Sequence, residues 1–152
     1  MEPIERYLSP DRIIFLSQCE KVEALKRLVD LVAQTSEVED RQLLLKAILD
    51  REQLLSTGIG LGIAVPHAKI ASVKDFVMAV AVSHDGIDFD ALDDKPVHII
   101  VLVAGPDQRQ SDYLRILSRI VLHLKDSRVR AQVLSARTPN EVYTILTGKA
   151  KA

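Results

Sequence analysis

The stretch Ser56-Thr57-Gly58-Ile59-Gly60-Leu61-Gly62-Ile63-Ala64-Val65-Pro66-His67 decides how the middle of this chain folds. Its three alternating glycines are incompatible with a helix and predict a loop in which backbone segments approach closely. The following residues 63–65 are apolar and predict a short strand, which Pro66 ends or confines to a sheet edge. We therefore expect His67 to lie at the end of a strand, on a backbone stiffened by the proline ring.

Two helices are predicted before this loop. Apolar residues recur at helical spacing from Val22 to Val32 and predict a helix from about Glu20 to Gln34. The pattern Ser17-x-x-Glu20 is typical of a capping box at its start. A second helix is expected from about Asp40 to Leu54.

Three more helices are predicted near the C-terminus. The first runs from about Asp112 to Lys125, and its apolar face is expected to comprise Leu114, Leu117, Val121 and Leu124. A short helix follows at about 128–135. Thr138-Pro139-Asn140-Glu141 combines a capping box with proline at the first helical position, and predicts the start of a last helix.

Between these helical regions lie two predicted strands. Residues Phe76 to Val82 indicate a buried strand, and Gly86 to Asp94 a turn-rich connection. Val97 to Ala104 is apolar on both faces apart from His98, as expected of a central strand. The mixture predicts a single α/β domain over residues 1–152, with a mixed β-sheet flanked by helices in two or three layers.

The composition excludes several classes of protein. The 152 residues are 47% hydrophobic and 27% charged, which is normal for a globular domain and argues against disorder. The formal net charge of −1 provides no overall field for nucleic acid or an anionic membrane. Cys19 is the only cysteine, and neither a signal sequence nor an apolar run of about 20 residues is present. We expect a cytoplasmic protein without direct membrane insertion.

Four histidines are the first candidates for chemistry, and only His67 has a distinctive setting. No two histidines lie at the i, i+4 spacing of a helical zinc pair, so no metal site is expected. His84 is predicted in a turn, His123 off the apolar face of its helix and His98 at the start of the central strand, and a structural role is favoured for each. Near neutral pH an imidazole is largely uncharged, so a rigidly held His67 is suited to act as a nucleophile.

Arg51 is the second candidate, because it extends an apolar stripe. Positions 44, 47, 48 and 51 follow i, i+3, i+4, i+7 spacing, with Leu44, Ala47 and Ile48 as the apolar members. A charge on this stripe is costly unless something pairs with it. The arginine either snorkels to the rim, pairs with a carboxylate, or acts as a clamp for an anion such as phosphate.

The glycine loop is by itself a weak indication of function. Its glycines fit neither the Walker A pattern nor the dinucleotide-binding pattern. The backbone N–H groups around Gly58 and the hydroxyl of Thr57 are nevertheless candidates to line a small anion site.

Taken together, Arg51-Glu52-x-x-x-Ser56-Thr57-Gly58-Ile59-Gly60-x-Gly62-Ile63-Ala64-Val65-Pro66-His67-Ala68 resembles the signature of the EIIA type-2 domain. This is the fructose/mannitol-class IIA component of the phosphoenolpyruvate-dependent phosphotransferase system (PTS), and the class includes the nitrogen-regulatory IIA type. The segments from Gly86 to Val97 and Leu114-x-x-Leu117-Ser118 are also similar to the family.

The resemblance implies a function. It implies a phosphotransferase component that carries a phosphoryl group on His67, received from the phosphocarrier HPr or a paralogue of it, with Arg51 supporting the phosphohistidine. No cofactor, metal or nucleotide is implied. One departure stands out, because the family's second active-site histidine is replaced by Tyr113, which is neutral near pH 7 and cannot supply an imidazolium charge.

Three roles follow from these residues. The chain either passes phosphate from His67 to a separate IIB component, or acts as a phosphorylation-dependent regulator that binds target proteins. A freestanding chain and the run Pro66-His67-Ala68-Lys69 favour the regulator slightly. The third role is a degenerate binding module without phosphotransfer, which Tyr113 alone supports and the retained His67 and Arg51 oppose.

Overall fold

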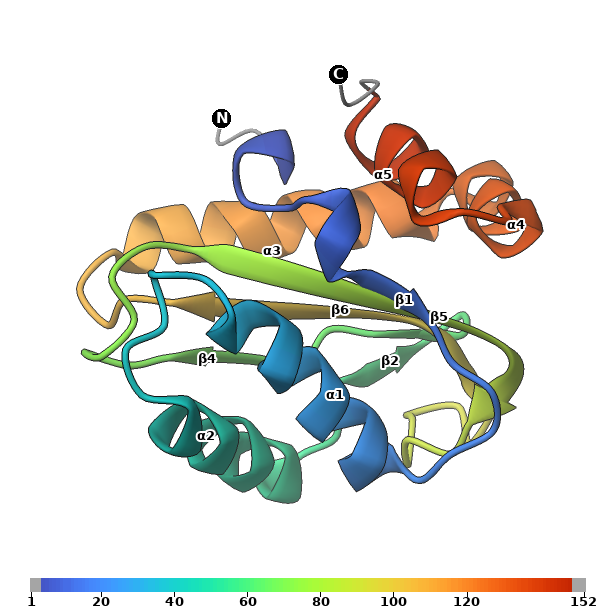
Figure 1. Ribbon diagram of the computed structural model, residues 1–152. Helices are drawn as coiled ribbons and strands as arrows, with labels where there is room; N and C mark the ends of the chain where they lie inside the picture. Colours follow the sequence, from blue (N-terminus) through green and yellow to red (C-terminus); the bar gives the residue numbers. More distant parts are fainter. Residues whose placement is uncertain (1–3, 149–152) are drawn as a thin grey trace.

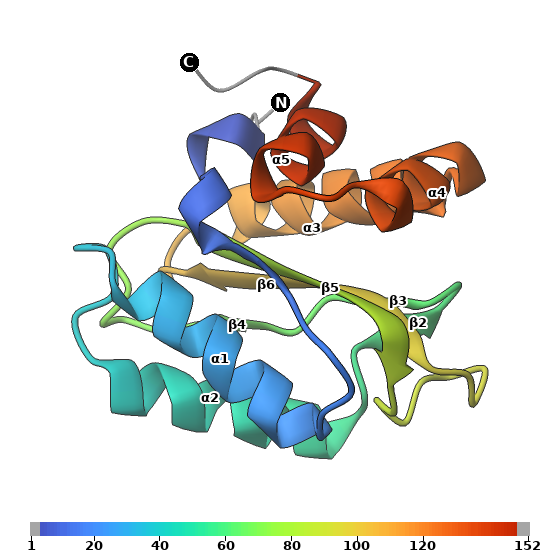
Figure 2. The ribbon, with the colours of Figure 1, turned by 45° about the vertical axis from the view of Figure 1, so that its right-hand side comes forward.

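The computed structural model describes residues 4–148, in which one mixed β-sheet lies between two layers of helices (Figure 1). On one face lie α1 (Lys21–Ala33) and α2 (Arg41–Leu54). On the other face lie α3 (Gln110–Lys125), α4 (Ser127–Ser135) and α5 (Pro139–Thr147). Figure 2 shows the same separation after a 45° turn. The predicted α/β class with a flanked mixed sheet is therefore confirmed.

The sheet has the strand order β1-β5-β6-β3-β2, with β4 also paired to β6. The strands are β1 (Ile13–Phe15), β2 (Gly58–Gly60), β3 (Ile63–Ala64), β4 (His67–Lys69), β5 (Val77–Ile87) and β6 (Val97–Gly105). β5 runs antiparallel to β6, whereas β3 and β4 both pair with β6 in parallel. Two short helical turns, Ile4–Arg6 and Pro10–Arg12, precede the sheet.

The two central strands divide the interior into two cores. Ile99, Val101 and Val103 of β6 pack with α3 and α5. The alternate residues Ile100 and Leu102 pack with α1 and α2. Such alternation is the period of a strand buried on both faces, which is why both faces of β6 are apolar. Within residues 4–148, no helix is both long and apolar enough to cross a membrane.

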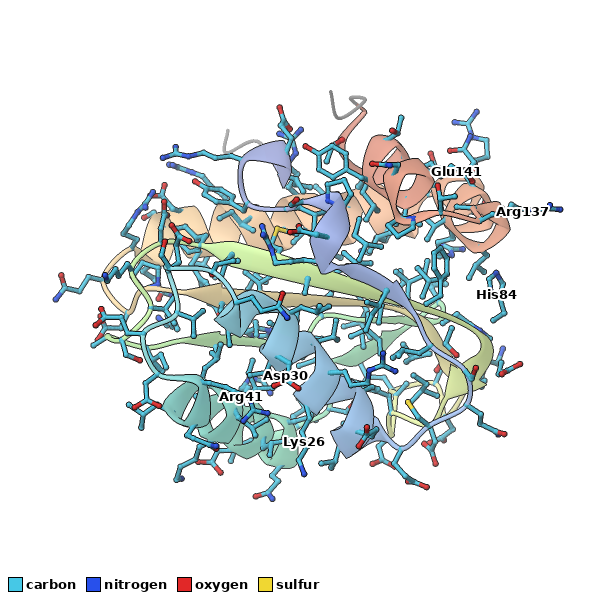
Figure 3. All side chains as sticks on the ribbon, in the orientation of Figure 1. Lys26, Asp30, Arg41, His84, Arg137 and Glu141 are labelled. Atoms are coloured by element: carbon cyan, nitrogen blue, oxygen red, sulfur yellow. The ribbon has the colours of Figure 1, made fainter. Side chains whose placement is uncertain are left out.

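Most predicted helix limits agree with the structure to within one or two residues. The final capping box is confirmed, because the Thr138 hydroxyl accepts the N–H of Glu141 at 3.2 Å. The Glu141 carboxylate in turn accepts the N–H of Arg137 at 2.8 Å (Figure 3). The first capping box is wrong, because Glu20 caps α1 and makes no side-chain hydrogen bond there. An ion pair between Asp30 and Arg41, both labelled in Figure 3, ties α1 to α2.

The predicted face of α3 needs correction. Its buried residues are Tyr113, Ile116, Ile120 and Leu124. Leu114 is 52% exposed, whereas Leu117 and Val121 are partly buried at the edge of the core. Two neighbouring apolar stripes run along this helix, and the sheet covers the one that begins at Tyr113. Periodicity alone does not show which of two adjacent stripes faces the sheet.

β5 is longer than predicted. It continues to Ile87 through an irregularity in the pairing with β6 after Val82, and Gly86 adopts a left-handed φ of +87° there. His84 therefore lies in a strand and not in a turn, which corrects its predicted place. The His84 ring stacks on Phe15 at 6.4 Å, and its Nε2 lies 2.5 Å from the carbonyl oxygen of Leu134.

Candidate active site

His67 is the first residue of β4, and the chain before it is fixed on both sides. The N–H of Val65 donates to the carbonyl of Thr57 at 3.1 Å, and the N–H of Val103 donates to the carbonyl of Pro66 at 3.0 Å. His67 itself pairs in register with Val103 of β6. Pro66 has no backbone N–H. The chain can therefore cross from β3 to β4 at this residue without leaving a donor that lacks a partner.

The His67 ring has a defined tautomer in this arrangement. Its Nδ1 lies 2.7 Å from the carbonyl oxygen of Val65. A carbonyl oxygen only accepts hydrogen bonds, so Nδ1 carries the proton and donates it. In the neutral ring, Nε2 is then left with a lone pair. Nε2 is therefore the ring nitrogen whose lone pair is available.

Burial lowers the pKa of His67 below its ordinary value. The Val65 carbonyl opposes this shift, and the positive charge of Arg51 adds to it. A lowered pKa increases the neutral fraction of the ring near pH 7. The ring is thus held in the form that can attack an electrophile.

Tyr113 of α3 lies against His67. The two rings meet edge to face, with centroids 5.8 Å apart and planes at 63°. Phe76 also stacks on Tyr113, with ring centroids 6.3 Å apart, and the Nζ of Lys69 lies 5.6 Å from the tyrosine ring centroid. Burial raises the pKa of the Tyr113 phenol well above its ordinary value. The phenol therefore stays protonated and offers a neutral hydroxyl beside the histidine.

Arg51 lies in the last turn of α2 and extends the buried stripe formed by Leu44 and Ile48. Its side chain is half-buried, and its Nη1 donates to the carbonyl oxygen of Leu55 at 2.8 Å. The positive charge of Arg51 adds to the lowering of the His67 pKa by burial and opposes the raising of the Tyr113 pKa by burial. The structure thus brings Arg51, His67 and Tyr113 into one neighbourhood.

Thr57 and Gly58 are directed at other partners in this arrangement. The N–H and hydroxyl of Thr57 donate to the carboxylate of Glu52 at 2.7 and 2.8 Å. The N–H of Gly58 donates to the Ser56 hydroxyl oxygen at 3.0 Å. A Cβ at Gly58 would lie 2.8 Å from the Cβ of Ala91, so this glycine permits a close approach of β2 to the loop after β5. The predicted part of these two residues in an anion site stays a prediction.

Two charged residues near the site escaped the sequence-based prediction. Glu52 is buried, and Lys21 at the start of α1 pairs with it at 3.0 Å. The spacing offered an indication, because Leu44, Ile48 and Glu52 follow i, i+4, i+8 on one face of α2. A carboxylate at the end of such a buried stripe requires a partner.

The remaining histidines bond to backbone carbonyls. The Nδ1 of His98 lies 2.8 Å from the oxygen of Ser83, and the Nε2 of His123 lies 3.1 Å from the oxygen of Ile145. Across the part of the chain that the structure describes, no three His, Cys, Asp or Glu side chains are grouped so as to hold a metal ion.

Comparisons with known proteins agree on one family. Residues 6–149 match the family described as "Phosphoenolpyruvate-dependent sugar phosphotransferase system, EIIA 2". The chain is 37% identical over 141 residues to the fructose-specific EIIA component of Haloferax volcanii, covering 91% of this chain and 92% of that protein. It is 31% identical over 144 residues to the nitrogen regulatory protein of Pseudomonas aeruginosa, covering 94% of each.

Solved structures show the same fold. The nitrogen regulatory protein IIA-Ntr of Neisseria meningitidis superposes with a TM-score of 0.88 at 27% identity, covering 95% of this chain and 99% of that one. The mannitol IIA of Escherichia coli superposes with a TM-score of 0.78 at 22% identity, covering 91% and 98%. The second likeness shows the fold alone.

Proposed function

This chain belongs to the EIIA type-2 family of the phosphoenolpyruvate-dependent sugar phosphotransferase system, and we propose that it carries a phosphoryl group on the Nε2 atom of His67. The observation that carries this proposal is the 2.7 Å contact between Nδ1 and the Val65 carbonyl. That contact occupies the proton-bearing nitrogen and leaves the other one as the acceptor atom. Burial keeps the ring neutral and therefore nucleophilic.

The transfer we propose exchanges one nitrogen–phosphorus bond for another. The lone pair of His67 Nε2 attacks the phosphorus of a phosphohistidine on HPr or a paralogue. The donor's N–P bond breaks, and its electron pair returns to the donor ring. The ring proton of His67 stays on Nδ1, hydrogen-bonded to the Val65 carbonyl, throughout the transfer, so the acceptor ring exchanges no proton with solvent. Transition-state charge spreads over the three equatorial oxygens, and Arg51 offsets part of it.

Tyr113 gives this site a neutral neighbour. Its phenol is held protonated and can donate a hydrogen bond to a phosphoryl oxygen, but it adds no positive charge. We expect the phosphohistidine to form, with a transfer rate or a partner preference that differs from a site with two histidines. A binding module that has lost phosphotransfer is the alternative, and Tyr113 is the observation that favours it.

The next step after phosphorylation is either transfer or regulation. Relatives of both kinds match nearly the whole chain, since one is named a fructose-specific EIIA component and another a nitrogen regulatory protein. In the first case phosphate passes to a IIB component. In the second, the added negative charge at His67 changes the surface that a target protein meets.

Intact-mass measurement under alkaline conditions tests the proposal. The protein is incubated with phosphoenolpyruvate, enzyme I and HPr, and compared with His67→Ala and with His84→Ala, an exposed histidine of β5. We expect one phosphate adduct on the wild type and on His84→Ala, and none on His67→Ala. No adduct on the wild type, with HPr paralogues also tried, would favour the binding module. Adding a IIB domain to the phosphorylated protein and following loss of the adduct then separates transport from regulation.

A further inference from the structure

A buried ion pair joins α1 to α2, and the proposed transfer does not use it. The Lys21 Nζ lies 3.0 Å from Oε1 of Glu52, and the two side chains are 17% and 4% exposed. Burying two charges is expensive unless further hydrogen bonds satisfy them. Here they do, because the carboxylate also accepts the N–H and the hydroxyl of Thr57.

From Thr57 the contacts continue to the histidine ring. The Thr57 carbonyl accepts the N–H of Val65 at 3.1 Å. The Val65 carbonyl then accepts the Nδ1 proton of His67 at 2.7 Å. Two backbone residues therefore connect the buried carboxylate to the nitrogen that sets the tautomer of the ring.

The same ion pair joins several segments that are distant in sequence. Lys21 comes from the first turn of α1 and Glu52 from the last turns of α2. The Lys21 ammonium also donates to the carbonyl of Phe89 at 3.2 Å and lies 4.7 Å from the centroid of its ring. The Ser56 hydroxyl donates to that same carbonyl at 2.5 Å. The start of the glycine loop is thus anchored to both helices and to the loop after β5.

We propose that Lys21, Glu52 and Thr57 form a positioning network that holds the Val65 carbonyl against Nδ1 and so keeps Nε2 of His67 unprotonated. If the network loosens, the Val65 carbonyl moves, and the ring proton is free to transfer to Nε2. A proton on Nε2 occupies the lone pair that attack requires. The consequence for transfer rests on the proposed function, whereas the effect on the tautomer does not.

Four variants test the network. Glu52→Gln keeps the size of the side chain and removes its charge. Lys21→Met removes the partner, and the double variant Lys21→Met/Glu52→Gln leaves no buried charge, which protects folding. Asp50→Asn is the matched control, because it neutralises an exposed carboxylate on the same helix, 57% exposed and paired with Lys46 at 2.6 Å.

The first readout is the ¹⁵N spectrum of the histidine rings, with the His67 signals identified by their loss in His67→Ala. We expect His67 to be predominantly Nδ1-protonated in the wild type and in Asp50→Asn. In Glu52→Gln and in the double variant we expect a substantial Nε2-protonated population. The second readout is phosphorylation by phospho-HPr, where we expect kcat to fall by roughly tenfold to a hundredfold with KM nearly unchanged, because ring geometry and not docking is altered.

The two readouts separate the possible failures. If the wild type takes up no phosphate but its tautomer shifts in Glu52→Gln, the network stands and the proposed function fails. An unchanged tautomer in Glu52→Gln overturns the network whatever the kinetics show. If Glu52→Gln does not fold, the double variant decides, and an unchanged tautomer in that variant likewise overturns the network.

Discussion

The His67 imidazole resists protonation in the folded chain because burial lowers its pKa. In the unfolded chain its pKa is about 6.5. Below that value the unfolded state binds the proton before the folded state does, so the free energy of unfolding decreases as pH falls. The stabilisation is fully present above the unfolded pKa and is lost as pH falls toward and through the lower folded pKa.

This difference predicts a pH-dependent effect of replacing the ring. Between pH 7.5 and 5.5, the wild type should lose more of its free energy of unfolding than His67→Gln loses, since glutamine does not titrate. Urea unfolding of both proteins at several pH values measures the difference. Parallel pH dependence in the two proteins would show that His67 is not protected from protons.

Replacing the Tyr113 phenol by an imidazole, which titrates near neutral pH, should change the rate of phosphorylation. Tyr113→His should accelerate phosphorylation of His67 by about tenfold or more below pH 6.5, where an imidazolium adds positive charge beside the phosphoryl group. Above pH 7.5 the gain should largely vanish. Rates of adduct formation at pH 6.0 and pH 8.0 measure it, with Tyr113→Phe as the ring-preserving control. Equal rates for all three proteins at both values would leave Tyr113 with a packing role only.

For single residues, sequence motifs predicted the candidate site residues better than the buried residues that hold the site in place. The motifs predict His67 and Tyr113 as site residues, and the structure brings their rings together, whereas their roles stay predictions. Lys21 and Glu52 were missed because they are 31 positions apart, and only the packing of α1 on α2 joins them. Local spacing indicates that Glu52 requires a partner, but it does not identify Lys21 as that partner.

Among the elements, the end of β6 is closely packed against Phe76. A Cβ at Gly105 would lie 2.5 Å from Cδ1 of Phe76, closer than side chains normally approach. Phe76 in turn stacks on Tyr113 and lies 4.9 Å below the Arg109 guanidinium. Because Gly105 has no side chain, the Phe76 ring that stacks on Tyr113 can lie against the end of β6.

We therefore expect Gly105→Ala to lower the free energy of unfolding by about 1–3 kcal/mol, the usual cost of overpacking. The variants Phe76→Leu and Gly105→Ala/Phe76→Leu complete a double-mutant cycle, measured by denaturant unfolding. The double variant should lose less than the two single losses added, because a smaller side chain relieves the contact. Strict additivity would mean that the alanine methyl is accommodated elsewhere.

The helices and strands could be predicted where the sequence pattern that specifies them lies within the element itself. The helices followed from their periodicity, and the cap at Thr138 followed from its motif. The Ser17 cap failed because α1 begins at Lys21, so that Glu20 and not Ser17 is the N-cap. The length of β5 was missed because pairing with β6 extends it past polar residues such as His84. Long-range pairing overrides local preference in the second case.

At the level of the whole molecule, the sequence predicted an α/β class but not the strand order. The order depends on which distant segments pair, such as β1 with β5 and both β3 and β4 with β6. Both helical layers rest on one sheet, and its central strands contribute side chains to both cores. We therefore expect the two layers to unfold together.

Two matched cavities test this cooperativity. Leu102→Ala opens the core beneath α1 and α2, and Ile99→Ala opens the opposite core. Each should lower the free energy of unfolding by about 2–5 kcal/mol. The chain itself supplies a probe for each layer. All three tyrosines (Tyr7, Tyr113 and Tyr143) belong to the core that contains Ile99, whereas Cys19 packs against the core that contains Leu102.

Tyrosine fluorescence and the labelling of Cys19 should then report the same denaturation midpoint in each variant, although each cavity lies on one side only. The reason is that β6 cannot lose its packing on one face and keep its position for the other, since the same strand forms both. A Leu102→Ala protein in which Cys19 becomes reactive well before tyrosine fluorescence changes would show that the α1–α2 layer opens alone. In that case His67 would lose the support of α2 while the rest of the sheet stays folded.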